Sequence, residues 1–191
     1  MTGPVPGWWG GTVHFPVPRV PPQPAPGSTG TDAGLSEELA SVVAGARRRA
    51  LRDGDRQIDT AHLLHSLVES EPEVRAAFGG PDQVARVLGY LVQRSIGYGL
   101  RWQATVEDSG ANPVAPPARD SGQTSWSPSA AAAMLRARER AAGRGDPRAG
   151  GLDLLAELAA DRHSRAVEVL VHAGVDTERL TGRIGELSQQ V

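Results

Sequence analysis

Apolar residues recur every three or four positions over most of the chain after residue 34, a spacing that predicts amphipathic helices. The first stripe consists of Leu39, Val42, Val43, Ala46 and Ala50. Ser36 is suited to cap the start of this helix, because its hydroxyl can accept a free backbone N–H, and the two glutamates after it suit the helix dipole. The helix is expected to end at Asp53-Gly54.

Three further helices are expected before residue 98. One begins near Asp59-Thr60, a short one runs from Pro72 to the glycine pair at 79–80, and one opens at Pro81, since proline fits the first turn of a helix. Their apolar stripes are Leu63, Leu64 and Leu67 in the second helix, and Val84, Val87, Leu88, Leu91 and Val92 in the fourth.

Two stretches lack this periodicity. Residues 1–34 hold eight of the fifteen prolines, and residues 99–125 are rich in glycine and proline. Such segments bury too little apolar surface to offset the entropy of ordering them. We therefore predict a disordered tail at 1–34 and a linker at 99–125. Trp8 and Trp9 in the tail could dock on a partner or on the chain's own domain, or make contacts without function.

The chain contains an internal repeat. Shifting it by 91 residues aligns 35–67 with 126–158 without a gap, and eleven of these 33 positions are identical. The identical pairs include Ser36/Ser127, Gly54/Gly145, Asp55/Asp146, Leu63/Leu154, Leu64/Leu155 and Leu67/Leu158. The predicted fold class is all-α, with two tandem four-helix repeats at 35–98 and 126–188 in a duplicated helical bundle.

Composition excludes several chemistries. The chain has no cysteine, and its 20 basic residues are all arginine, which rules out disulfides, thiol nucleophiles, cysteine-based metal sites, a P-loop lysine and Schiff-base chemistry. The net charge of −2 disfavours a general nucleic-acid binder. The apolar stretches are shorter than a membrane span. We expect a cytoplasmic protein that is not an enzyme and takes no cofactor.

The duplicated unit resembles the N-terminal domain of the Clp ATPases, most closely of the ClpC type. The family's repeat opens with an aromatic-Thr helix start, and Leu35-Ser36 and Trp126-Ser127-Pro128 are similar. Its central Gly-Thr-Glu-His-Leu-Leu-x-x-Leu helix resembles DTAHLLHSL at 59–67 and, more distantly, GGLDLLAEL at 150–158. Its closing Leu-Gly-Val-Asp segment resembles VLVHAGVD at 169–176. The resemblance covers residues 35–188.

This resemblance implies a non-catalytic protein- or peptide-binding module of the Clp protease system, without ATPase modules of its own. Its partners would be a Clp ATPase, the adaptors of that ATPase or its substrates. In ClpC-type domains the Glu of the central motif, with the Ser or Thr at the first helix start, can hold a phosphorylated arginine. The matching positions here are Ala61 and Leu152. We expect phosphoarginine recognition to be lost or weakened, with Ser36 and Ser127 interpreted as N-caps.

The remaining candidate binding residues lie on and beside the first helix of each repeat. Arg47, Arg48, Arg49 and Arg52 form a basic patch, repeated by Arg136, Arg138, Arg140 and Arg144. Each patch is either a solvated face or a contact for acidic protein or nucleic acid. The net charge makes a DNA-associated regulator the weakest alternative. Trp126 either seals the junction between the repeats or contributes to a site for cyclic peptide antibiotics, as the resemblance implies, and the chain would then be a stand-alone sink for such peptides.

Metal-ligand patterns are incomplete. His62 and His65 are three residues apart on one expected helix, without a third ligand nearby in sequence. Asp53, Asp55 and Asp59 lack the bidentate Glu that a calcium loop requires, and a turn explains them. We expect no metal site.

Overall fold

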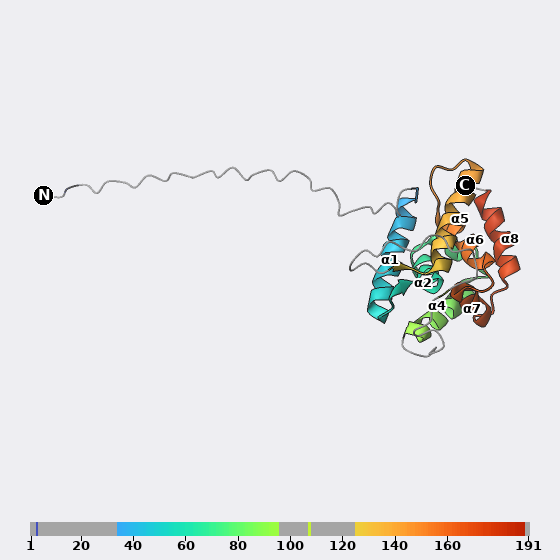
Figure 1. Ribbon diagram of the computed structural model, residues 1–191, viewed down its shortest axis with the longest axis horizontal. Coiled ribbons are helices and arrows are strands. Elements are labelled where there is room, and N and C mark those ends of the chain that lie inside the picture. Colours follow the sequence, from blue (N-terminus) through green and yellow to red (C-terminus); the bar gives the residue numbers. More distant parts are fainter. Residues whose placement is uncertain (1–2, 4–33, 96–106, 108–124, 190–191) are drawn as a thin grey trace.

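A computed structural model describes residues 3, 34–95, 107 and 125–189, and within them the chain forms eight helices and two short strands (Figure 1). The first half contains α1 (Glu37–Asp53), β1 (Gln57–Ile58), α2 (Thr60–Ser70), α3 (Pro72–Ala76) and α4 (Pro81–Ser95). The second half contains β2 (Ser125–Trp126), α5 (Pro128–Arg144), α6 (Gly151–Ala160), α7 (Arg165–His172) and α8 (Thr177–Ser188). The predicted all-α fold with four helices in each half is confirmed. Nearly all of the predicted tail and of the predicted linker lies outside the described residues.

The ends of α1 follow from local chemistry. The Ser36 hydroxyl accepts the backbone N–H of Leu39 at 3.1 Å, and Gly54 ends the helix in the left-handed conformation at φ 75°. The second half repeats both features at the predicted offset, since Ser127 accepts the N–H of Ala130 at 3.1 Å and Gly145 has φ 86°. A residue with a side chain is strained at such φ values, so glycine at both helix ends has a physical reason.

Short parallel strand pairings tie the two halves together. Residues 57 and 58 of β1 pair with 125 and 126 of β2. Leu35 forms a parallel bridge with Ala149 in the same way. Adding the offset of 91 to Leu35 gives Trp126, and subtracting it from Ala149 gives Ile58. The opening of each half therefore pairs with the segment before the central helix of the other half, which is the pattern of a twofold axis. The alternation of hydrophobic and polar residues in the sequence did not predict these strands.

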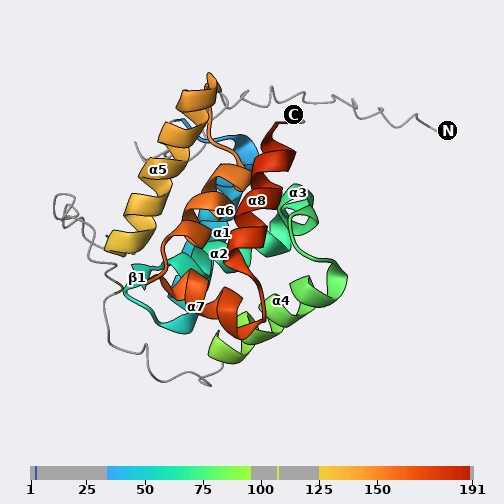
Figure 2. The same cartoon turned by 90° about the vertical axis from the view of Figure 1, so that its right-hand side faces the viewer.

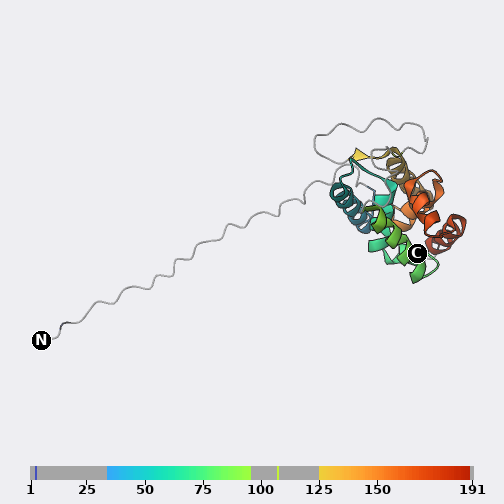
Figure 3. The same ribbon diagram turned by 90° about the horizontal axis from the view of Figure 1, so that it is seen from below.

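The central helices α2 and α6 form the middle of the core. α2 contacts α1, α3, α4, α5, α6 and α7, and α6 contacts α5, α7, α8, α2 and α3. The leucines predicted to face inward are fully buried on both helices: Leu63, Leu64, Leu67, Leu154, Leu155 and Leu158. One apolar cluster runs through both halves. In both views, the helices of the first half (blue to green) lie against those of the second half (orange to red) (Figures 2 and 3). Among the described residues, no helix combines the length and apolarity needed to cross a membrane.

Candidate functional site

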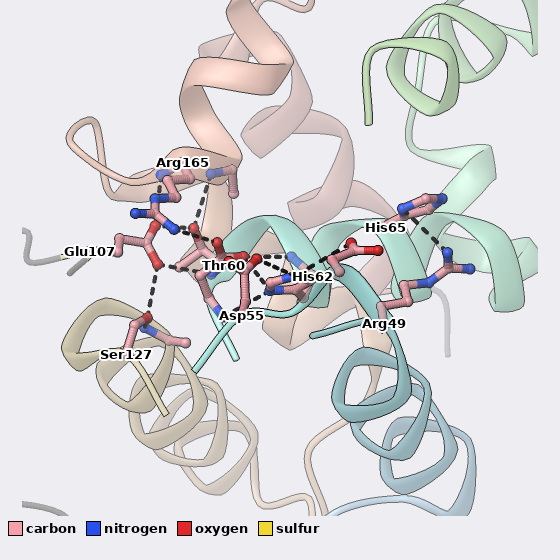
Figure 4. A network of polar contacts seen from close by, with 12 residues as sticks. Arg49, Asp55, Thr60, His62, His65, Glu107, Ser127 and Arg165 are labelled. Atoms are coloured by element: carbon pink, nitrogen blue, oxygen red, sulfur yellow. Dashed lines mark hydrogen bonds and ion pairs between the residues drawn. The ribbon is translucent and has the colours of Figure 1, made fainter. Parts of the chain in front are cut away.

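A buried carboxylate lies where three helices begin. Glu107 is only 5% exposed, and one of its oxygens, Oε2, accepts the backbone N–H of Thr60 at 2.9 Å and the hydroxyl of Ser127 at 2.8 Å. Its other oxygen, Oε1, accepts the backbone N–H of Arg165 at 2.7 Å and the hydroxyl of Thr60. Figure 4 shows Glu107 between Arg165 and Ser127, with Thr60 beside it. Both oxygens are therefore held by donors from other parts of the chain.

The donors around Glu107 come from helix starts. Thr60 is the first residue of α2, Ser127 is the N-cap of α5, and Arg165 is the first residue of α7. Backbone N–H groups in the first turn of a helix have no partner within the helix, and the helix dipole places partial positive charge there. Three such ends directed at one point make a favourable environment for an anion. The Thr60 hydroxyl also accepts the N–H of Ala166 at 3.0 Å, which joins α2 to α7.

A second polar cluster begins one residue away, at Asp59. The Arg165 guanidinium donates to Asp59 Oδ2 at 2.7 Å, and the backbone N–H of His62 donates to Asp59 Oδ1 at 2.8 Å. The His62 ring is 2% exposed, and its Nε2 lies 3.2 Å from Asp55 Oδ2 and 3.8 Å from Asp53 Oδ2. These contacts fasten the end of α1 to the start of α2.

The second half has a polar contact at the corresponding positions, with an arginine in place of Asp53 and an aspartate in place of His62. At the offset of 91, Asp53 corresponds to Arg144 and His62 to Asp153. Arg144 donates to both carboxylate oxygens of Asp153, at 2.5 and 3.0 Å, and this hydrogen bonding raises the pKa of Arg144. Asp153 also accepts the backbone N–H of Gly150 at 3.0 Å, as His62 Nδ1 accepts that of Asp59 at 3.2 Å. Both halves thus join their first and central helices by a polar pair, with opposite polarity.

Asp55, Asp59 and His62 also meet the distance requirement for metal ligands, since one ligand atom from each lies within 4.8 Å of the others. Imidazole and carboxylate would suit zinc. Both oxygens of Asp59, however, already accept hydrogen bonds from His62 and Arg165. The inverted pair in the second half performs the same fastening without a histidine. We therefore interpret this cluster as a polar link between helices, and the expected absence of a metal site stays a prediction.

His65 belongs to a different cluster from His62. It lies on α2 with its Nδ1 3.4 Å from Arg49 of α1, and Arg49 also contacts Ser66 at 3.3 Å and forms an ion pair with Glu69. Burial, assisted by the positive charge of Arg49, lowers the pKa of His65 to about 4. The imidazole is therefore neutral near pH 7. Figure 4 shows His65 turned away from His62, toward Arg49.

The site at the start of α6 is open where the site at the start of α2 is filled. A hollow of about 510 Å³ lies there, lined by Glu73, Arg144, Asp146, Pro147, Arg148, Gly150, Gly151, Leu152, Asp153 and Ser188. Gly151 stands at the position of Thr60 and has no hydroxyl to offer. A Cβ on Gly151 would lie 3.1 Å from a methyl group of Val74, so α6 packs closely on α3 at this glycine. The two related sites are therefore chemically different.

The structure separates the residues predicted to bind a ligand. Ser127 is fully buried against Glu107, whereas Ser36 caps α1 and is half-buried. Trp126 is half-buried against the core and pairs with Ile58. Arg47 and Arg138 are half-buried on α1 and α5.

The positions that would carry the family's carboxylates are also differently placed. Ala61 is completely buried, and half-buried Leu152 lines the hollow at α6. Neither side chain can bind a guanidinium. These positions therefore offer no carboxylate to an arginine-bearing ligand.

Acidic side chains neutralise much of the predicted basic patches. On α1, Arg49 pairs with Glu69 and Arg52 with Asp53. The α5 pairs are Arg136 with Glu157, Arg140 with Asp153, and Arg144 with both Asp146 and Asp153. A phosphate backbone would have to compete with these carboxylates, which weakens the DNA-binding alternative further.

Sequence reasoning missed Glu107 and Arg165. Glu107 lies in the stretch predicted to be a linker, and its donors are 20, 47 and 58 residues away along the chain. Arg165 was part of a helical pattern without distinguishing neighbours. An acidic residue in a stretch without apolar periodicity carries no local signal of burial, so periodicity and motif spacing could not have found it.

No protein-family model and no curated protein matches the sequence. Solved structures match its fold. The N-terminal domain of the caseinolytic protease associated chaperone ClpD from Arabidopsis thaliana is 17% identical with a TM-score of 0.58, and the match covers 85% of this chain and 99% of that domain. The Hsp104 N-terminal domain from Candida albicans is 13% identical with a TM-score of 0.59, covering 81% and 91%. A structure from a malarial protein secretion system is 11% identical with a TM-score of 0.56. The chain thus has the fold of the Clp N-terminal domains.

Proposed function

We propose that this chain, with the fold of the N-terminal domains of Clp chaperones, is a non-catalytic protein- or peptide-binding module of a cytoplasmic Clp protease system. It would act as an adaptor, a substrate-recognition module or a competitor for the N-terminal domain of the Clp ATPase itself. The observation that carries the proposal is the fold match, which spans nearly all of the ClpD and Hsp104 N-terminal domains.

The surface at the start of α6 is the contact site that we favour. Its hollow of about 510 Å³ combines exposed Arg148 with half-buried Leu152 and the carboxylates of Glu73 and Asp146. A concave site with an apolar residue and charges of both signs suits a peptide segment better than a nucleic acid. With Ala61 and Leu152 in place of the family's carboxylates, the ligand is not expected to be a phosphoarginine.

The test is a binding and competition assay with the Clp ATPase of the same genome. The full chain is titrated into the ATPase and its protease partner, and degradation of a model substrate is followed alongside direct binding. We expect saturable binding and a change in the degradation rate. Arg148→Glu should weaken the binding and reduce the change in degradation rate. Arg48→Glu, at an exposed position of α1, should affect neither. Absence of binding to the ATPase, its adaptors and its substrates would refute the proposal.

The cyclic-peptide sink is the alternative that this assay leaves standing if no protein binds. Trp126 is half-buried and packs on the core, so it is not completely closed off from solvent. Cyclic peptides titrated against the chain should change tryptophan fluorescence, and the change should disappear in Trp126→Phe. A tight signal without any protein partner would move the function to ligand sequestration.

A further inference from the structure

We infer that the junction of α2, α5 and α7 is a carboxylate-binding site that Glu107 fills from within the chain, and that an acidic side chain of a peptide can take the same place when Glu107 is absent. The inference is independent of the Clp partners proposed above, because it depends only on the residues that surround Glu107.

The Glu107 carboxylate is held in the way that a protein holds a bound ligand. Each oxygen of Glu107 accepts two hydrogen bonds, from two backbone N–H groups and two hydroxyls. Every one of these donors comes from a residue at the start of a helix, and Thr60 and Ser127 are no more than 1% exposed. A carboxylate held by backbone N–H groups at helix starts is stabilised by charge-assisted hydrogen bonds and by the dipoles. α2 packs directly on both α5 and α7, so the helices themselves bring these donors together.

The repeat supports this interpretation. The corresponding helix start in the second half, at Gly150-Gly151, has no hydroxyl equivalent to that of Thr60, and a hollow lined in part by Glu73, Asp146 and Asp153 lies there. Among the described residues, the four-donor arrangement around Glu107 is thus seen at the start of α2 and not at the start of α6.

A ligand that is part of the chain competes strongly with external ligands. Its effective concentration is on the order of millimolar or higher, so free carboxylates at lower concentration do not displace it. Removal of the Glu107 side chain beyond Cβ leaves a gap that matches acetate, which carries the same carboxylate on one carbon. Acetate is therefore the probe for the site.

The experiment measures the thermal midpoint of the full chain and of Glu107→Ala with increasing acetate, against chloride at equal ionic strength. We expect Glu107→Ala to unfold about 5–10 °C below the wild type, because four buried donors lose their acceptor. Acetate should restore at least half of this loss and leave the wild-type midpoint unchanged. Ser127→Ala in the Glu107→Ala background should reduce the recovery, because it removes one donor.

Two further variants separate site binding from general effects. Leu170→Ala empties a fully buried apolar position on α7, and acetate should not raise its midpoint. Glu107→Gln keeps the volume but turns an amide toward the donors, so it should be destabilised without responding to acetate. If Glu107→Ala is unfolded in chloride, helicity is followed by circular dichroism during the same titration, and recovery by acetate supports the site. Equal responses of Glu107→Ala and Leu170→Ala, or no response of Glu107→Ala, would overturn it.

Acidic peptides then test binding in trans. A peptide with a single glutamate should bind Glu107→Ala at least tenfold more tightly than the wild type, as measured by calorimetry, and the matching glutamine peptide should not. If acetate restores stability and the glutamate peptide shows no preference for the variant, the trans part of the inference is wrong.

Discussion

Among single residues, His65 is the one whose protonation is most clearly coupled to folding. Its pKa is lowered to about 4, first by burial and then by Arg49 and Arg52, while Glu69 and Asp53 oppose the shift. The unfolded chain binds a proton at this position with an ordinary pKa of about 6.5. Between these values the unfolded state is protonated and the folded state is not, so stability increases with pH.

The free energy of unfolding should therefore decrease as the pH falls from about 6.5 toward 4. Denaturation by urea at several pH values measures the slope. His65→Gln keeps a side chain that can face Arg49 but cannot titrate, so its curve should be flatter over this window. An unchanged slope in the variant would show that other groups cause the acid sensitivity.

The inverted polar pair makes a second prediction at the same scale. Asp153 is 2% exposed and accepts two hydrogen bonds from Arg144. Arg144→Asp removes the donors and places a like charge beside it, which should lower the unfolding free energy by about 2–3 kcal/mol. Asp153→His in that background recreates the first-half arrangement, and we expect it to recover part of the loss. A double mutant that is no more stable than the sum of the single changes would contradict the equivalence of the pairs.

Among the elements, α1 and α5 have equivalent caps with different surroundings. Ser36 and Ser127 each accept an N–H at 3.1 Å, but Ser127 is fully buried and also donates to Glu107 at 2.8 Å. The offset therefore supplies a matched pair of substitutions in one molecule.

Ser36→Ala should lower the unfolding free energy by about 1 kcal/mol, the usual cost of an N-cap. Ser127→Ala should cost about 2–4 kcal/mol, because a buried carboxylate loses a donor as well. Denaturation by urea measures both. In a Glu107→Ala background the two costs should converge. Equal costs in the wild type would mean that the Ser127–Glu107 bond contributes little.

Helix positions could be predicted because their signals are local. Ser36, Gly54 and the leucines of α2 act on residues within a turn or two, and the repeat doubled each signal. The contacts of Glu107 and Arg165 join positions as far apart as 58 and 106 residues, and only the packed fold brings them together. The strand pairings are two residues long, too short to produce an alternating pattern. The candidate residue Ser127 was found as a cap, but its carboxylate partner was not.

For the whole molecule, the two halves complete each other. Ser36 N donates to Ala149 O and Ser127 N donates to Ile58 O, both at 2.9 Å, and the apolar core is continuous across the halves. A half on its own would expose the inner face of its central helix, and a unit of about 60 residues is marginally stable even when its apolar surface is covered.

Fragments 34–98 and 125–191 should therefore each be largely unfolded by circular dichroism, without a cooperative thermal transition. Mixed at equal concentration they should gain helicity, and the midpoint of the complex should rise with concentration. The intact chain should unfold in one transition. A cooperative transition in either isolated fragment would show that the halves are separate domains.

The exchanged pairing of Leu35 with Ala149 and of Ile58 with Trp126 has the geometry of an isologous dimer interface within a single polypeptide. In a homodimer of identical units, every substitution would enter both halves at once, so one position could not be aspartate while the equivalent position is arginine. Fusion removes that constraint. It lets Asp53 and Arg144 adopt opposite charges, and lets one junction hold Glu107 while its counterpart stays open. Covalent linkage of the halves is thus what allows this fold to hold two different sites in one symmetric frame.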